Sequence, residues 1–112
     1  MNIGIPKETH PGEQRVPFIP ASATRLTAKD AQITVEAGLG ESIGIPDSEY
    51  QKAGATVQSD RKALLASSDL TLRLRKPPAD EIGLLKKGSI HVSFLDPFNE
   101  KDLVNQLAQN QI

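Results

Sequence analysis

The sequence predicts an α/β domain in which a largely parallel sheet lies between two layers of helices. Strand-like and helix-like segments alternate along the 112 residues with short connections, which is the arrangement typical of parallel sheets. Eight Pro and eight Gly are spread along the chain, so they bound many short segments rather than form a low-complexity tract. The length and the 38% hydrophobic fraction suit one domain whose core buries about 65% of the unfolded chain's surface.

Composition and charge exclude several classes of function. The chain has 13 Lys plus Arg against 14 Asp plus Glu, a net charge of -1, which removes the main electrostatic reason to expect a nucleic-acid partner. The absence of Cys excludes disulfides, thiol catalysis and Cys-ligated metal centres. His10 and His91 have no further ligand at metal-binding spacing, so no metal site is expected. No stretch approaches the ~18 apolar residues of a membrane span, and we expect a soluble protein without a leader segment.

The first half of the chain predicts three extended segments and two helices. Residues 3–5 are a short apolar run that Pro6 ends, which suits a buried strand. A polar loop follows, and a helix is expected over residues 20–30 with Pro20 at its first position. Residues 31–37 are rich in β-branched side chains and predict a strand. Asp47 is then expected to cap a short helix to residue 53, before a short extended segment over residues 54–57.

Three glycines, at positions 38, 40 and 44, follow a predicted strand as they do in dinucleotide-binding loops. Their spacing is one residue longer than G-x-G-x-x-G, and Ile45-Pro46 stands where a helix should begin. We therefore interpret them as turn formers. A Ser nucleophile elbow, a paired-His zinc motif and a phosphate-binding loop are also absent from the sequence.

The second half predicts two strands and three helices. Ser59 or Asp60 caps a helix over residues 61–67, and residues 69–76 form a strand that Pro77-Pro78 ends. A helix is expected over residues 80–87 with Gly88 after its end, then a strand over residues 89–95 and a helix capped by Asn99. Ile112 resembles the first residue of a further strand, so we expect the chain to be a fragment of a longer protein.

Basic side chains are predicted to gather at one edge of this sheet. In parallel sheets, ligands bind outside the carboxyl ends of the strands, where the strand order reverses. The segments expected there are the loop after the first strand, the end of the strand over residues 69–76 and the turn after residue 95. They carry Arg15, Arg73, Arg75 and Lys76, with Asp96 beside them. The sequence therefore outlines an anion site.

Arg73 and Arg75 allow two interpretations. They lie on one face of their strand, with Leu70, Leu72 and Leu74 on the other. The strand either lies at an edge, with solvated arginines that protect it from aggregation, or the arginines form a fork for a carboxylate or phosphate. From these patterns alone, the function stays at an α/β domain with a basic cleft edge.

The sequence resembles the N-terminal domain shared by alanine dehydrogenases and the alpha subunits of nicotinamide nucleotide transhydrogenases. The resemblance begins with IGIPKE at residues 3–8 and PGEQRV at residues 11–16. It continues through VEAGLGE at residues 35–41 and EIGLLKKG at residues 81–88. It covers essentially the whole chain, in order and with similar spacing. It implies a flavodoxin-like three-layer fold at the N-terminal end of a two-domain, dehydrogenase-like architecture, with residues 1–112 as its N-terminal domain.

Two positions in the sequence depart from the alanine dehydrogenase pattern. In that branch, the substrate carboxylate is held by the Arg of the PGE-x-R-V loop, here Arg15, and by a Lys that the resemblance places at Arg73. A catalytic His ends the next strand, and here that position is Asp96, which cannot readily do the proton work of an imidazole near pH 7. By contrast, HVSFLDPFN at residues 91–99 resembles the transhydrogenase alpha subunits. The resemblance therefore favours the transhydrogenase branch.

That branch implies the N-terminal segment of the NAD(H)-binding alpha subunit of a proton-translocating NAD(P)+ transhydrogenase. Direct hydride transfer between NADH and NADP+ needs two positioned nicotinamides and no acid or base, so no catalytic residue is assigned. Arg15 and Arg73 are expected to line the nicotinamide cleft, with Arg75, Lys76 and Asp96 as its further edge. NAD(H) would be held mainly by a Rossmann domain expected after residue 112, so this segment by itself is expected to be inactive.

The resemblance also implies partners and a location. NADP(H) would lie on the NADP-binding beta subunit, which joins a membrane component, and the full-length alpha subunit is expected to form a homodimer. The protein would be cytoplasmic and peripheral to the inner membrane. Two alternatives stay open: an alanine dehydrogenase-like amino-acid oxidoreductase with an altered site, and a non-catalytic module that binds an anion or a partner.

Overall fold

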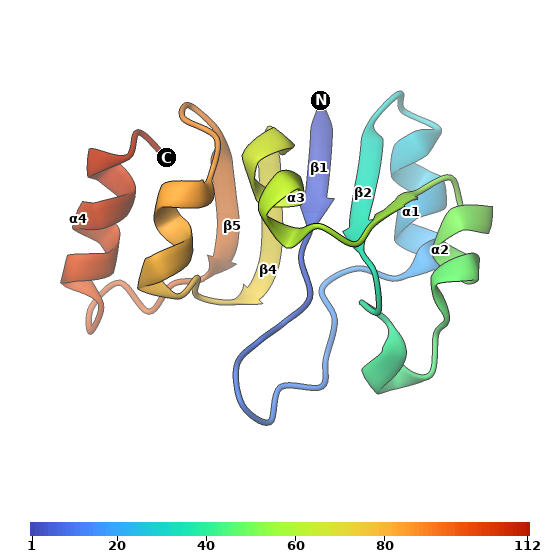
Figure 1. The fold of residues 1–112 in the computed structure, drawn as a ribbon, viewed down its shortest axis with the longest axis horizontal. Helices are drawn as coiled ribbons and strands as arrows, with labels where there is room; N and C mark the ends of the chain where they lie inside the picture. The colour runs from blue at the N-terminus through green and yellow to red at the C-terminus, as the bar shows by residue number, and fades with distance from the viewer.

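The computed structural model describes all 112 residues as a five-stranded parallel sheet flanked by helices (Figure 1). All strand pairs are parallel, which confirms the predicted α/β class and the alternation of strands and helices. The strands are β1 (Asn2–Ile5), β2 (Gln32–Glu36), β3 (Thr56–Gln58), β4 (Leu70–Arg75) and β5 (Ile90–Phe94).

The strand order, β3-β2-β1-β4-β5, places a reversal point between β1 and β4. The flavodoxin order is 2-1-3-4-5, whereas this order is that of the doubly wound dinucleotide-binding fold. The difference arises because the chain moves outward twice, from β1 to β2 and from β2 to β3, before it crosses back to β4. The loop after β1 leaves the sheet at this reversal point, and Figure 1 shows it extending below the carboxyl ends of the strands.

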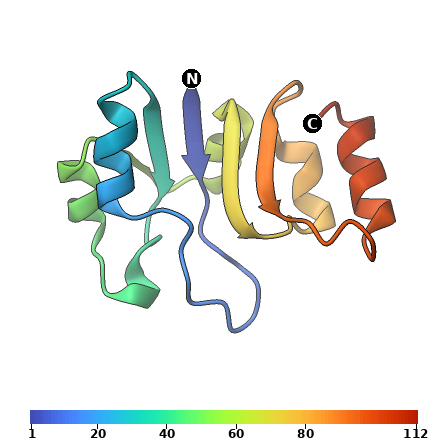
Figure 2. The ribbon, with the colours of Figure 1, turned by 180° about the vertical axis from the view of Figure 1, so that it is seen from behind.

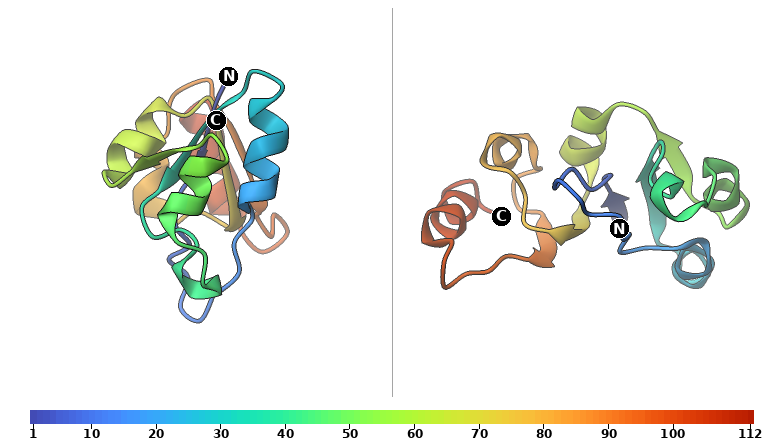
Figure 3. Two further views of the ribbon diagram at one scale, coloured as in Figure 1. Left: turned by 90° about the vertical axis from the view of Figure 1, so that its right-hand side faces the viewer. Right: turned by 90° about the horizontal axis from the view of Figure 1, so that it is seen from below.

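Helices lie on both faces of the sheet (Figure 3). Helix α1 (Pro20–Thr27) packs on β2, and α2 (Asp47–Lys52) packs on β3 and α1. Helix α3 (Arg61–Ser67) crosses the opposite face, where it contacts β1, β2 and the 3-10 helix η2 (Ala79–Leu84). Helix α4 (Lys101–Gln109) packs on η2. A second 3-10 helix, η1 (Glu41–Ile43), follows β2. None of the helices is both long and apolar enough to cross a membrane.

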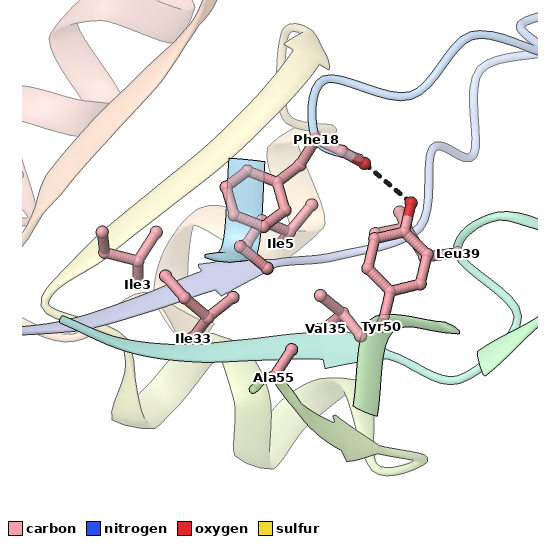
Figure 4. Packing of buried hydrophobic residues seen from close by; sticks show 9 residues of the cluster. Ile3, Ile5, Phe18, Ile33, Val35, Leu39, Tyr50 and Ala55 are labelled. Carbon is pink, nitrogen blue, oxygen red and sulfur yellow. Dashed lines mark hydrogen bonds between the residues drawn. The ribbon is translucent and has the colours of Figure 1, made fainter. Parts of the chain in front are cut away.

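The main core lies between the sheet and α1 and α2. Figure 4 shows the apolar side chains of β1 and β2 packed with Phe18, Leu39 and Tyr50. The buried Tyr50 hydroxyl donates a hydrogen bond to the backbone oxygen of Phe18 over 2.7 Å. This contact ties α2 to the end of the loop that follows β1. A second, smaller apolar cluster joins α3, η2 and α4.

Several predicted helix boundaries are wrong. The helix expected over residues 80–87 is the 3-10 helix η2, which ends at Leu84 because Leu85 is extended. Helix α1 ends at Thr27 rather than Asp30, which has a left-handed φ of 63°. Asp47 is the first residue of α2, not its cap, and its carboxylate accepts a hydrogen bond from the Gly38 N–H instead.

At the other helix starts, Asp60 caps α3 by accepting from the Ala63 N–H, as one of the two predicted alternatives has it. Helix α4 starts after Glu100 rather than Asn99, whose side chain donates to Asp96 instead. Ile112 is not in a strand; its N–H bonds to Leu107.

One face of β4 and β5 carries apolar side chains without a covering helix. Ile90, Val92 and Phe94 are 51%, 43% and 77% exposed, and Leu70 and Leu72 beside them are half-buried. Figure 2 shows this face, where α1 covers β2 and leaves β4 and β5 open. The opposite face of the same two strands is the buried one.

Candidate functional site

A cleft lies at the reversal point, between the loop after β1 and the carboxyl ends of β4 and β5. We call it the switch-point cleft. Its volume is about 760 Å³, and its walls are His10, Arg15, Leu74, Arg75, Lys76, Ser93, Phe94, Leu95, Asp96 and Pro97. A neighbouring pocket of about 440 Å³ shares His10, Arg75 and Lys76 with it and reaches Arg73 and α4. Four of the five predicted site residues therefore line the cleft, and Arg73 lies outside it.

The loop after β1 is held against β4 by Glu8. Its carboxylate accepts hydrogen bonds from the backbone N–H groups of Leu74 (3.0 Å) and Arg75 (2.9 Å). These N–H groups lie next to an irregularity in the pairing of β4 with β5, between Leu72 and Arg75. A loop side chain thus binds backbone donors at the end of a strand, and this contact fixes the loop that carries Arg15.

Glu13 joins Arg15 and Arg75 at the centre of the cleft wall. Its Oε1 accepts from Arg15 Nη2 (2.7 Å) and Arg75 Nε (2.9 Å), and its Oε2 accepts from Arg15 Nε (3.0 Å) and the Arg15 N–H (3.1 Å). The Glu13 side chain is 4% exposed, whereas those of Arg15 and Arg75 are 68% and 45% exposed. The guanidinium groups therefore lie on the solvent side of a covered carboxylate, and their hydrogen bonds hold the pKa of Glu13 well below its usual range.

The other polar groups of the cleft are paired as well. Lys76 forms an ion pair with Glu100, the residue before α4. Asp96 follows β5 with a left-handed φ of 53°, and its carboxylate accepts from Asn99 Nδ2 over 3.0 Å. The anion site predicted from the sequence therefore does not consist of unpaired cations, because glutamates pair with its basic side chains.

Arg73 belongs to a buried ion network rather than to the cleft. Its side chain is 2% exposed, and its Nη1 donates to Glu81 Oε1 over 2.9 Å. Arg61 contacts the same Glu81 and also Glu36, at 2.5 and 2.8 Å. Burial raises the pKa of Glu81, but hydrogen bonds from Arg61 and Arg73 outweigh it and lower the pKa below its ordinary value.

This position overturns one interpretation of the Arg73 strand. The alternative of an edge strand with solvated arginines is wrong, since β4 lies between β1 and β5. The side of β4 that looks polar in sequence is buried: Thr71 is 1% and Arg73 is 3% exposed. Helix α3 and η2 cover this side and supply Arg61 and Glu81 to the ion network.

Two glutamates that complete the site, Glu8 and Glu13, were not predicted from the sequence as site residues. Both lie in the motifs that carry the family resemblance, IGIPKE and PGEQRV. Glu13 precedes Arg15 by two residues, a spacing that allows the side-chain to N–H contact seen here. That local signal was available, whereas the pairing of Glu13 with Arg75, 62 residues away, depends on the fold.

The two histidines have different surroundings. His91 lies on the covered side of β5, with its Nε2 3.0 Å from Ser93 Oγ and no partner for Nδ1. Burial, with a contribution from the charge of Arg73, lowers its pKa to about 4. His10 is exposed and lines the cleft. No group of three or more acidic or His side chains could hold a metal ion.

The residues after β2 do not fit the pyrophosphate of a dinucleotide. The Gly38 N–H is bonded to Asp47 and the Leu39 N–H to Glu36, so neither is free for a phosphate. The acidic Glu41 begins η1 next to them, where a phosphate site needs a helix N-terminus without negative charge. Gly38 and Gly44 have left-handed φ values of 83° and 76°, in line with their interpretation as turn formers.

The fold and cleft define a doubly wound α/β domain with a polar site at its reversal point, a class typical of coenzyme-dependent enzymes. The chain belongs to the family described as "Alanine dehydrogenase/PNT, N-terminal domain", which it matches over residues 4–112. Its relatives are oxidoreductases, named as alanine dehydrogenases and as alpha subunits of NAD(P) transhydrogenases.

Relatives come from both branches of this family. Alanine dehydrogenase from Mycobacterium tuberculosis is 37% identical over 95 residues, which cover 85% of this chain and 26% of the relative. NAD(P) transhydrogenase subunit alpha from Cereibacter sphaeroides is 33% identical over 104 residues, which cover 93% of this chain and 20% of the relative. The chain thus spans less than a third of the length of these two relatives.

Solved structures show the same two branches. The crystal structure of transhydrogenase from Sinorhizobium meliloti superposes with a TM-score of 0.92 at 32% identity, covering 99% of this chain and 33% of that one. An L-alanine dehydrogenase structure superposes with a TM-score of 0.91 at 28% identity, covering 97% and 30%. The similarities establish the family and do not separate its branches.

Proposed function

We propose that this chain forms the N-terminal domain of the NAD(H)-binding alpha subunit of a proton-translocating NAD(P)+ transhydrogenase. The observation that carries the proposal is Asp96 at the end of β5, which lines the same cleft as Arg15 and Arg75. The resemblance to alanine dehydrogenases calls for a His at this position. A carboxylate there supplies no imidazole for proton transfer near pH 7.

His91 does not replace the missing imidazole. It lies on the covered side of β5, and burial lowers its pKa to about 4, so it stays neutral at pH 7. It is also absent from the walls of the cleft. Direct hydride transfer between two nicotinamides requires positioning and exclusion of water, not an acid or a base, and therefore agrees with this site.

The proposal extends to the assembly. NAD(H) would be bound mainly by another part of the polypeptide, since the residues after β2 do not fit its phosphates. NADP(H) would be bound by a beta subunit that contacts a membrane component, with the alpha subunit as a peripheral homodimer on the cytoplasmic side. The relatives named as transhydrogenase alpha subunits support an assembly with further subunits.

Alanine-dependent reduction of NAD+ tests the choice of branch. The complete protein is expected to show no alanine turnover, because Asp96 stands in place of the proton-transferring His. Turnover in the usual enzymatic range, about 1–1000 per second, would contradict the proposal.

One observation favours the second candidate, an alanine dehydrogenase-like oxidoreductase with an altered site. His10 lines the switch-point cleft together with Arg15 and Arg75, so an imidazole is present, although it comes from a different element. If it carried proton transfer, His10→Ala would abolish alanine turnover while His91→Gln would leave it unchanged. If the two substitutions lowered alanine turnover equally, or if neither changed it, His10 would be excluded from proton transfer.

A further inference from the structure

We propose that one buried water molecule binds between β4 and β5, on the side of the sheet that α3 and η2 cover, and bridges the side chains of Thr71, Arg73 and His91. The site is separate from the switch-point cleft, because none of these three residues lines that cleft. Its ligand is a neutral molecule that both donates and accepts hydrogen bonds. The proposal does not depend on the proposed function.

Three buried polar atoms on this side of the sheet have no hydrogen-bond partner within the protein. They are Thr71 Oγ1, Arg73 Nε and His91 Nδ1, and no other buried side-chain atom of the chain is unpaired in this way. Thr71 and Arg73 are 1% and 3% exposed. Native proteins leave few buried polar groups unsatisfied, because each one loses its hydration without compensation. All three at one place therefore indicate a ligand that satisfies them together.

The three side chains are neighbours on two adjacent strands. Thr71 and His91 are aligned in the parallel pairing of β4 with β5, and Arg73 follows Thr71 on the same side of β4. Adjacent strands lie about 4.8 Å apart, and alternate residues of one strand about 6.6 Å. A molecule that forms hydrogen bonds of about 2.8 Å in two directions spans such separations. The charge of Arg73 also contributes to the lowered pKa of His91, as expected for a guanidinium near the imidazole.

The pairing of the two strands is irregular at the same place. Leu72 is aligned with Val92, and the next aligned pair is Arg75 with Phe94, so Arg73 has no aligned partner on β5. Buried water molecules typically make about three hydrogen bonds to polar groups that the protein leaves unsatisfied. A water molecule here would join the two strands where their direct pairing is interrupted.

The donors and acceptors at the site match those of water. Arg73 Nε–H can only donate. Burial lowers the pKa of His91 to about 4, so its ring is neutral at pH 7, and its Nε2 lies 3.0 Å from Ser93 Oγ. When Nε2 carries the ring proton, Nδ1 can only accept, whereas the Thr71 hydroxyl can do either. Water can accept from Arg73, donate to His91 and form a third bond with Thr71.

The charge balance favours water over an anion such as chloride. In the ion network beside the site, the two guanidinium groups of Arg61 and Arg73 are matched by the carboxylates of Glu36 and Glu81. An added anion would therefore be a buried charge without a counter-charge, which is costly. The pocket of about 440 Å³ next to the switch-point cleft reaches Arg73, and this gives water a path to the site.

A high-resolution crystal structure of the complete protein tests the proposal directly. It should show one water molecule about 2.7–3.2 Å from each of the three atoms. Crystals grown in bromide distinguish water from an anion, because bromide is located by its anomalous scattering. A bromide ion at this position would overturn the proposal. A direct hydrogen bond between Thr71 and His91, with no water between them, would overturn it as well.

Thr71→Val tests the site in solution, because it keeps the shape of the side chain and removes the hydroxyl. Magnetic relaxation dispersion of the water signal detects long-lived bound water. The bridging water should exchange about tenfold faster in this variant, as the loss of one hydrogen bond implies. Thr71→Ser keeps the hydroxyl and should retain the slow exchange. Thr56→Val, at an exposed position of β3, is the matched control and should change nothing. An unchanged exchange rate in a folded Thr71→Val variant would contradict the proposal.

Discussion

The two arginines Arg15 and Arg73 form similar ion pairs but lie in different surroundings. Arg15 and Arg73 both carry guanidinium groups bound to glutamates, yet their side chains are 68% and 2% exposed. The pair at Arg15 covers Glu13 and faces the cleft, while the pair at Arg73 lies beneath α3 and η2. Buried charges are tolerated only when paired, so Arg73 supports the fold. Arg15 is paired as well, but its guanidinium is exposed at the cleft, where a ligand can reach it.

Arg15→Ala should weaken ligand binding or turnover and leave the fold intact. The Arg15 side chain is largely exposed and its partner Glu13 is also bound by Arg75, so the loop keeps one of its contacts. Thermal unfolding of the variant should stay within about 0.5 kcal/mol of the unchanged protein, as is usual for surface substitutions. A sharp drop in unfolding temperature would show that Arg15 is structural.

The unfolding free energy should fall on acidification because of His91. Its pKa is about 4 when folded and 6.5 in the unfolded chain, so the unfolded state takes up the proton first, and stability is lost as the pH falls from 6.5 toward 4. Between pH 7 and pH 5 the loss is about 2 kcal/mol. The unfolding free energy of His91→Gln, measured with urea, should lack this part of the pH dependence. If the unfolding free energies of the variant and of the unchanged protein fell in parallel with pH, His91 would not be the cause.

The sequence was sufficient to identify Arg15, Arg75, Lys76 and Asp96 as neighbours, because each follows or ends a parallel strand at the same edge. It was not sufficient to place Arg73. The alternating pattern of β4 predicts on which side of the strand Arg73 lies. Whether that side is exposed or buried depends on η2, whose Glu81, eight residues further on, pairs with Arg73.

Among the elements, the end of α3 lies very close to β1, and this contact positions α3 on the sheet. A Cβ on Gly4 of β1 would lie 1.9 Å from Ser68 Oγ and 3.1 Å from Leu64 Cδ2. Ser68 is fully buried, and its hydroxyl donates to the Leu64 backbone oxygen. Only a glycine lets the end of α3 lie this close to β1.

Gly4→Ala is therefore expected to destabilise the protein by about 2 kcal/mol or more, as overpacking of a core does. Gly83→Ala is the matched control, because a Cβ there meets no atom within 4 Å. Denaturant unfolding should separate the two variants; similar midpoints would show that α3 moves away at little cost.

The elements themselves were predictable, and their ends were less so. The alternating pattern of β4 and the apolar run of β1 are local sequence signals that predict these two strands. The shortening of the predicted helix 80–87 to η2 has no clear local signal, since it depends on the extended backbone at Leu85, which is buried in the cluster of α3 and α4.

At the scale of the whole molecule, two features favour a domain that forms only part of a larger site. One is the open apolar face of β4 and β5, and the other is the lack of a phosphate site after β2. The polar switch-point cleft has a ligand-facing wall, but the N–H groups after β2 are bonded within the domain. These features support the proposal that the domain contributes one wall of a coenzyme site and not the whole site.

Calorimetric titration of the 112-residue chain with NAD+ should accordingly show no binding in the micromolar range. The phosphates of the coenzyme supply much of its affinity in dinucleotide folds through a helix N-terminus and a glycine loop, and neither is present in suitable form here. A micromolar dissociation constant would contradict this assignment.

Hydride transfer from NADPH to an NAD+ analogue tests the proposed transhydrogenase function most directly. The complete protein is combined with its candidate NADP-binding subunit, and reduction of the analogue is followed by absorbance. We expect transfer that requires both components and proceeds without alanine. Absence of transfer in the assembled complex, together with alanine-dependent NAD+ reduction by the protein on its own, would contradict the proposed function.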